Sequence, residues 1–174
     1  ENVTKVVFTD LYLRNPWFLK SLEEFAYIMI LDHHLADKDW NSDKTVFIKC
    51  EDGICAGYLC YWLFSKVKDI NVLDWLVACS CISDYCHIKT SDWLGKTFHK
   101  YKDKFEQVGT YVRTSGAIWD LQEDLSLAII YFKDDLKKVF DLIGEKFADI
   151  GNLRTAAEKV RKEVQRILSL FDKE

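Results

Sequence analysis

The sequence has few of the residues that interrupt regular structure, with one proline and seven glycines among 174 residues. The glycines stand singly, so there is no glycine-rich loop for binding phosphate. Neither His-Glu-x-x-His nor Gly-x-Ser-x-Gly occurs, which argues against the zinc proteases and serine hydrolases that carry these motifs. The longest uncharged apolar run, residues 54–64, is shorter than the roughly 20 residues that cross a bilayer. We therefore expect no membrane span, no cofactor and no catalytic residues, and we predict that the chain is not an enzyme.

An excess of positive charge is also missing. The chain has 24 basic and 28 acidic side chains, which give a formal net charge of −4. Without a basic stripe to neutralise phosphates, binding to nucleic acid is not expected. Aromatic residues, by contrast, make up 14% of the chain. Burial in a core explains most of them, and an aromatic contact surface is the alternative.

Cysteine is absent after residue 86, and all the cysteines lie in one stretch of the chain. An even number of clustered cysteines is typical of disulfides, which form in oxidising compartments. The alternative is that reduced cysteines serve as small apolar side chains in a core. The six residues form two groups of three: Cys50, Cys55 and Cys60, then Cys79, Cys81 and Cys86.

The spacing of the cysteines limits how they could pair. Residues five apart on a helix project about 140° apart, so Cys55 and Cys60 are not expected to bond each other. A helical hairpin that turns near residue 69 places Cys60 opposite Cys79, which is the preferred bridge. A zinc site at 79–87 is not expected, because its ligand spacing does not match the usual knuckles. The other two members of each group then pair in an order that spacing leaves open: Cys50 and Cys55 with Cys81 and Cys86.

Helical signals dominate the first half of the chain. The dipeptide Asn15-Pro16 is typical of an N-cap followed by a first helical residue, so we expect a helix from residue 17 to about 35. Further helices are expected over 54–67 and 72–85, and these two would form the cysteine-rich hairpin. The apolar segment 5–9 could be a strand, but it would have no partner, so we prefer an extended arm or a helical turn.

Longer amphipathic helices are expected in the second half. One begins at Ser91 and continues through residue 112, and a second runs from Ser115 through residue 147. Gly151 would close that helix, and Thr155 would open the last one with a capping box. These elements predict an antiparallel three-helix bundle. The sequence therefore predicts one all-α domain over 1–174, in which a cysteine-rich N-terminal helical hairpin (within 1–90) packs on the long bundle (91–174).

The string Asp32-His33-His34 most resembles part of an enzyme site. On a helix, adjacent imidazoles point about 100° apart, so they would not share one metal ion easily. We interpret the string as a solvated cluster at a helix end, where a protonated imidazole is favourable. An enzyme that uses these histidines or the cysteines is the remaining alternative.

These observations predict a non-enzymatic domain that binds a protein partner, secreted or displayed at a cell surface and stabilised by disulfides. Trp40, in a polar loop, is the candidate contact residue because core packing explains it least. Asn2 begins an Asn-Val-Thr sequon, which would be glycosylated in a secreted protein. The alternative is a cytoplasmic helical adaptor with reduced cysteines that binds an amphipathic partner helix.

Overall fold

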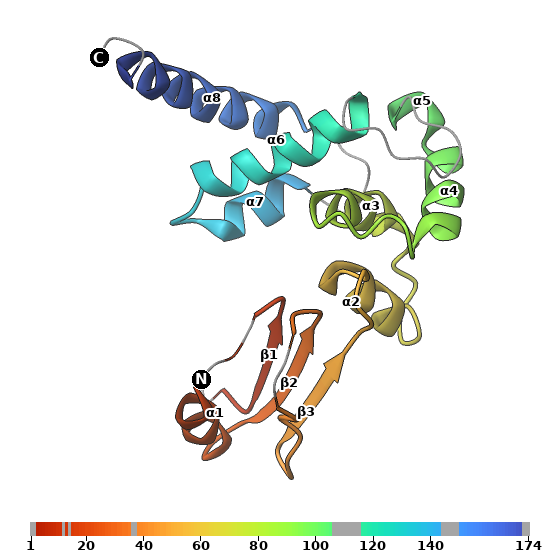
Figure 1. Ribbon diagram of the computed structural model, residues 1–174, viewed down its shortest axis with the longest axis vertical. Helices are drawn as coiled ribbons and strands as arrows, with labels where there is room; N and C mark the ends of the chain where they lie inside the picture. Colours follow the sequence, from red (N-terminus) through yellow and green to blue (C-terminus); the bar gives the residue numbers. More distant parts are fainter. Residues whose placement is uncertain are drawn as a thin grey trace.

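The fold is mixed α/β, and the prediction of an all-α protein is wrong. The computed structural model describes residues 3–11, 13, 15–35, 38–105, 116–143 and 150–171. Within this part of the chain, a three-stranded parallel sheet is formed by β1 (Lys5–Thr9), β2 (Tyr27–Asp32) and β3 (Thr45–Lys49), in the order β1-β2-β3. The sheet lies below the helical part of the molecule in Figure 1.

The first two strands and the helix between them explain the error. Asn15 caps α1 (Pro16–Glu23) as predicted, because its Oδ1 accepts a hydrogen bond from the Trp17 backbone N–H at 3.0 Å. The helix ends at Glu23 instead of continuing to residue 35, and the apolar run at 27–32 becomes the central strand. The segment 5–9 therefore has a parallel partner, with Val6 opposite Ile28 in the register. Val, Ile and Phe suit a half-buried strand better than a solvated helix.

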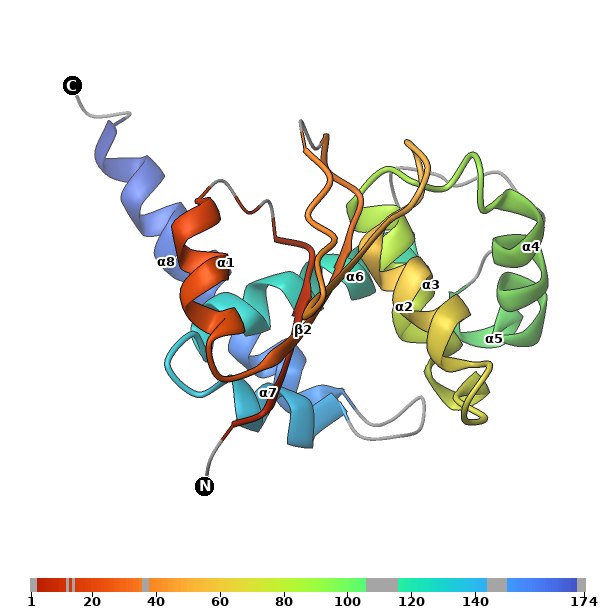
Figure 2. The ribbon, with the colours of Figure 1, turned by 90° about the horizontal axis from the view of Figure 1, so that it is seen from below.

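Helices cover both faces of the sheet, as a parallel sheet requires. Figure 2 views the strands edge-on, with α1 on one side and α2 (Ala56–Phe64) on the other. A small core between α1 and the sheet contains Leu19, Ile28 and Ile30, and Trp40 packs against it. Packing in this core therefore accounts for Trp40, whose role as a partner contact stays a prediction.

In the helical part of the molecule, the structure agrees more closely with the prediction from the sequence. The expected helices at 54–67 and 72–85 are present with narrower bounds, as α2 and α3, and they pack against each other. They approach closely at Gly57, where an added methyl group would overlap Ser80 Oγ and lie 3.0 Å from Ser80 Cβ. The bounds of the elements after α2 are η1 (Asn71–Leu73, a 3₁₀ helix), α3 (Asp74–Ser83), α4 (Ser91–Lys100), α5 (Lys102–Phe105), α6 (Ala117–Tyr131), α7 (Leu136–Ile143) and α8 (Gly151–Phe171).

Several predicted boundaries in the second half are wrong. The helix from Ser91 ends at Lys100 and the chain re-enters a helix as α5, while its predicted continuation to residue 112 lies outside the described residues. The helix predicted over 115–147 is divided after Tyr131 into α6 and α7. Gly151 begins α8 instead of closing the helix before it, so Thr155 is not its N-cap.

The main core lies among the helices from α2 to α8, around the fully buried Trp75, Leu94 and Phe98. The closest helix pair is α6 with α8, and the second half of α8 projects beyond the body in Figure 1. No helix in the described part of the chain is long and apolar enough to cross a bilayer, as expected. The division into a hairpin part (1–90) and a bundle part (91–174) of one domain stays a prediction.

Candidate functional site

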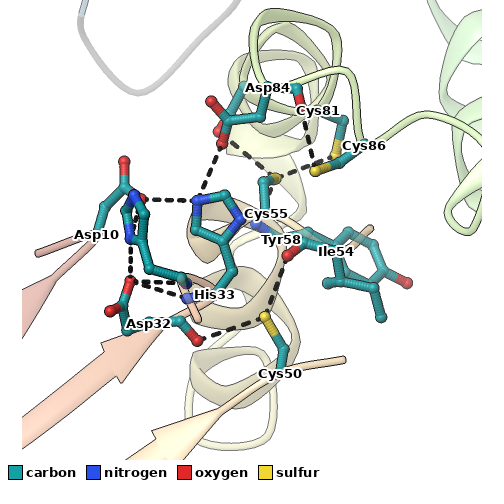
Figure 3. Close-up of polar contacts among 12 residues, drawn as sticks. Asp10, Asp32, His33, Cys50, Ile54, Cys55, Tyr58, Cys81, Asp84 and Cys86 are labelled. Atoms are coloured by element: carbon teal, nitrogen blue, oxygen red, sulfur yellow. Dashed lines mark hydrogen bonds and ion pairs between the residues drawn. The ribbon is translucent and has the colours of Figure 1, made fainter. Parts of the chain in front are cut away.

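The candidate site lies where the parallel strands end. Asp10 follows β1 directly, Asp32 is the last residue of β2, and His33 and His34 come next. In parallel sheets, ligands bind outside the carboxyl ends of the strands, where these side chains meet. The C-terminal end of α3 faces the same place and contributes Asp84 (Figure 3).

His33 is at the centre of a cluster of possible metal ligands. Its Nε2 lies 3.1 Å from Asp10 Oδ1 and 4.0 Å from Asp84 Oδ2. The side chains of Asp10, His33 and His34 each place one ligand atom within 4.8 Å of the others, and so do those of His33, Asp84 and Cys86. Ligand atoms about 2.0–2.3 Å from one metal ion are separated by roughly 3–4.5 Å. Both groups therefore have nearly the spacing that a bound divalent cation requires.

Asp32 fixes the positions of the two histidines through hydrogen bonds. It is 2% exposed, and its Oδ1 accepts hydrogen bonds from the His33 backbone N–H at 2.8 Å and from His34 Nδ1 at 2.7 Å. Burial alone would raise the pKa of Asp32, but the hydrogen bonds from His34 and the backbone outweigh it and lower that pKa. The same hydrogen bond raises the pKa of His34. A carboxylate bound to one ring nitrogen orients the imidazole, as in many metal sites.

Asp84, at the end of α3, adds negative charge to the cluster from the side of the helices. Burial and the nearby Asp10 raise the pKa of Asp84, although His33 and His34 act in the other direction. Three carboxylates (Asp10, Asp32 and Asp84) thus converge on the two imidazoles. A cation bound among them would remove this repulsion and favour the ionised form of Asp84.

Two residues beside the cluster have left-handed backbone conformations. Asp10 has φ 58° and Tyr85, between Asp84 and Cys86, has φ 55°. These are the non-glycine residues with positive φ among those described, and both adjoin the cluster. At Tyr85 this is an ordinary helix C-cap, in which the Tyr85 N–H donates to the Ile82 carbonyl at 3.1 Å and the Cys86 N–H donates to the Cys81 carbonyl at 2.8 Å. Aspartate adopts the left-handed conformation more readily than most residues. The two turns therefore position Asp10, Asp84 and Cys86, and they do not by themselves mark a functional site.

A cavity of about 260 Å³ opens beside the cluster. Asp10 and Asp84 belong to its wall, so it is continuous with the candidate metal site. The rest of the wall is uncharged, with hydroxyl and amide groups on one part and aliphatic side chains on another: Leu76, Cys79, Ser80, Ser83, Gln122, Leu125, Ser126 and Ile129. The cavity is therefore suited to a small organic group that carries neutral polar atoms.

None of the predicted disulfides is present, because all six cysteines are free thiols. The preferred pair, Cys60 and Cys79, is not bonded, and Cys50 directly follows β3. Cys50 Sγ donates to the Ile54 backbone carbonyl at 3.1 Å. Cys55 and Cys81 do face each other, with their sulfurs 3.6 Å apart. Bridges formed in an oxidising compartment stay a prediction, and the predicted glycosylation site, Asn2, lies outside the described residues.

The interpretation of Asp32-His33-His34 as a helix-end cluster is wrong, because the preceding residues form a strand. A signal was available in the sequence. Two apolar segments rich in β-branched residues, 6–9 and 28–31, are each followed by aspartate, which is typical of parallel strands with a site at their carboxyl ends. Asp84 and Cys86 had no such signal, since they enter the site through the packing of α3.

No protein-family profile, curated protein or solved structure matches this chain.

Proposed function

We propose that this chain is a hydrolase that depends on a divalent metal ion held by Asp10, His33, His34 and Asp84, with Cys86 as a further ligand. The observation that carries the proposal is the convergence of these side chains within ligand distance at the carboxyl edge of a parallel sheet. Carboxylate and imidazole ligands together suit first-row divalent cations such as Mn²⁺ and Zn²⁺. The prediction that the chain is not an enzyme stays untested, and this cluster favours the opposite conclusion.

The donor set supports hydrolysis in particular. A divalent cation lowers the pKa of bound water and so supplies a hydroxide nucleophile near neutral pH. His33 belongs to both ligand groups and offers one ligand nitrogen, so the two groups surround a single cation position. A cation there would also stabilise negative charge on the phosphoryl oxygens during displacement at phosphorus. We therefore infer phosphoesters as the substrate class, with a small uncharged polar leaving group that fits the adjoining cavity.

The first test is metal binding. Protein stripped with a chelator is titrated calorimetrically with Mn²⁺ and with Zn²⁺, and stoichiometric binding is expected. His33→Ala should abolish it, because His33 contributes to both ligand groups. The matched control is His99→Ala, since His99 is exposed on α4 and outside the cluster. Absence of binding in the wild-type protein, or equal binding by both variants, would overturn the proposal.

The second test is activity. The metal-loaded protein is assayed with an aryl phosphomonoester, an aryl phosphodiester and the corresponding carboxylic ester. Hydrolysis of a phosphoester that is lost in His33→Ala and in Asp84→Asn, but kept in His99→Ala, would support the assignment. Hydrolysis of the carboxylic ester alone would reject the substrate class and leave the metal site standing.

The predicted binding to a protein partner has one structural observation in its favour. The second half of α8 exposes apolar side chains, with Leu168 57% and Phe171 72% exposed. Such a face is typical of a contact surface. Its test is light scattering over a range of concentrations, in which self-association by the wild type and a monomeric Leu168→Lys variant would support a binding surface. A wild type that stays monomeric throughout argues against pairing through this face.

A further inference from the structure

Two buried thiols face each other between α2 and α3, beside the candidate metal site. Cys55 and Cys81 are both 0% exposed, and their sulfur atoms lie 3.6 Å apart (Figure 3). We propose that hydrogen peroxide joins Cys55 and Cys81 in a reversible disulfide, which makes this pair an oxidative modification site of the folded protein. The proposal concerns a protein whose cysteines begin reduced, and it is independent of the metal site.

The surroundings of Cys55 favour its thiolate. Cys55 is the N-cap of α2, and its Sγ accepts hydrogen bonds from the Tyr58 backbone N–H at 3.4 Å and from Ser80 Oγ at 3.6 Å. Thiolates are stabilised at helix N-termini, where backbone N–H groups point toward the sulfur. The hydrogen bond with the Cys81 thiol has the largest effect, and with these two contacts it outweighs burial and lowers the pKa of Cys55 to about 7. The attacking sulfur is thus assigned to Cys55.

Cys81 has the complementary role. It lies within α3 and not at a helix N-terminus, and its thiol faces Cys55, so it is placed to react with the Cys55 sulfur once that sulfur is oxidised. The two helices approach closely here through Gly57, so the sulfurs are already near bonding range. Their separation must shorten by roughly 1.5 Å to reach a disulfide bond length. Such a shift is within reach of small side-chain rotations of both residues.

Access from the cavity to the Cys55 and Cys81 sulfurs favours a small oxidant. Ser80 lines the 260 Å³ cavity, and its hydroxyl also contacts Cys55 Sγ. Hydrogen peroxide in the cavity is therefore separated from the sulfur by one serine side chain. A bulky oxidant such as glutathione disulfide does not reach a sulfur with no exposed surface. Oxidation by peroxide and resistance to glutathione disulfide should therefore be observed together.

The reaction balances without any further reagent. The Cys55 thiolate attacks one peroxide oxygen, the O–O bond breaks, and a sulfenic acid forms while the leaving hydroxide takes up a proton to become water. The Cys81 sulfur then attacks the Cys55 sulfur, forming the S–S bond as the S–O bond breaks. The Cys81 proton leaves with the hydroxyl group as a second water. Two thiols lose two electrons in total, and one peroxide is reduced to two waters.

The test uses the reduced full chain, which is treated with hydrogen peroxide while folded, then denatured, alkylated and digested without reductant. The expected result is one linked peptide pair containing Cys55 and Cys81, an intact mass lower by two hydrogens, and full reversal by dithiothreitol. Glutathione disulfide under the same conditions should leave both thiols alkylated. A linkage between other cysteines, or alkylation of both residues after peroxide, would overturn the proposal.

Serine variants separate the two roles. Cys81→Ser should stop at the sulfenic acid, which dimedone labels at Cys55 when the peroxide-treated protein is denatured in its presence, whereas Cys55→Ser should give neither label nor bridge. Serine is a good N-cap, so α2 is expected to form in Cys55→Ser, and circular dichroism checks this. Cys79→Ser is the matched control, because Cys79 is equally buried on α3 and should not affect the bridge. Loss of the bridge in the folded control, or dimedone labelling only at other residues in Cys81→Ser, contradicts the assignment.

Discussion

Replacing Asp32 by asparagine should destabilise the metal-free protein by an amount that depends on pH. The substitution keeps the size of the side chain and removes its charge. Asp32 is buried at the end of β2 and accepts hydrogen bonds from the His33 backbone and from the His34 ring. These contacts hold both histidines in the candidate site. The same substitution therefore tests how the site is kept in place.

The expected magnitude follows from the two contacts. A hydrogen bond to a charged group contributes about 1.5–3 kcal/mol, and one between neutral groups contributes about 0.5–1.5 kcal/mol. Replacing the Asp32 carboxylate by an amide should therefore weaken the hydrogen bond from the His33 backbone N–H by about 1 kcal/mol. The His34 side chain is 44% exposed, so solvent screens its ion pair with Asp32 and limits it to about 1 kcal/mol. Asp32→Asn should therefore lower the free energy of unfolding by about 2 kcal/mol where both groups are charged.

The two pKa shifts define the pH range. The pKa of Asp32 is lowered from 3.8, so its contribution is complete above that value and is lost as the pH falls through the folded-state pKa. The pKa of His34 is raised from 6.5, so its contribution is complete below that value and is lost as the pH rises through the folded-state pKa. The cost of Asp32→Asn should therefore be largest near pH 5 and fall to about 1 kcal/mol in alkaline solution.

Urea denaturation at pH 5 and at pH 9, with a chelator present, measures this difference. The control is Asp39→Asn, which removes the same charge from an exposed turn where Asp39 accepts from the Asn41 backbone N–H at 3.0 Å. Its effect should be the same at both pH values, because it has no histidine partner. An equal cost of Asp32→Asn at the two pH values would refute the reasoning, and so would a larger cost at pH 9.

Three further predictions concern stability. Gly57→Ala should lower the free energy of unfolding by about 1 kcal/mol. The reason is that overpacking against Ser80 costs about 1–3 kcal/mol, whereas the gain in helix propensity is at most about 1 kcal/mol. A double-mutant cycle measured by urea denaturation should show a smaller cost of Gly57→Ala when Ser80→Ala is also present. Phe98→Ala should cost about 3–5 kcal/mol in the same assay, whereas Phe140→Ala at an exposed position should change stability by less than about 0.5 kcal/mol. Mn²⁺ at about 100 times its dissociation constant should stabilise the wild type by about 2.7 kcal/mol and leave the thermal midpoint of His33→Ala unchanged.

The sequence predicts elements well where a local signal decides them. The Asn15-Pro16 start of α1 is confirmed because a cap depends on neighbouring residues only. The helices at 56–64 and 74–83 were also found, since their apolar runs are too long for most strands. The sheet was missed because a parallel strand is stabilised by a partner distant in the chain, which a local pattern does not contain. Interpreting 27–32 as helix also removed the strand that pairs with 5–9.

The candidate site was missed for the same reason. On a helix, His33 and His34 point apart, but after a strand they are held together by Asp32, and their rings lie 4.6 Å apart. Asp10 becomes relevant only when β1 is recognised as the neighbouring strand. Asp84 lies at the end of α3, and its position depends on how α3 packs against α2 and α6. One wrong assignment, at 27–32, thus concealed both the fold class and the site.

The candidate site joins the two parts of the molecule. Asp10 and His33 belong to the sheet edge, whereas Asp84 belongs to the helical part, so a cation bound among them would connect the two. Asp10 and Tyr85 have left-handed backbones on the two sides of this junction. At Tyr85 this conformation ends α3 as a helix C-cap, with the Cys86 N–H donating to the Cys81 carbonyl at 2.8 Å, and the cap brings Asp84 and Cys86 to the site. The case for a bound cation therefore depends on the converging carboxylates and imidazoles and not on the backbone.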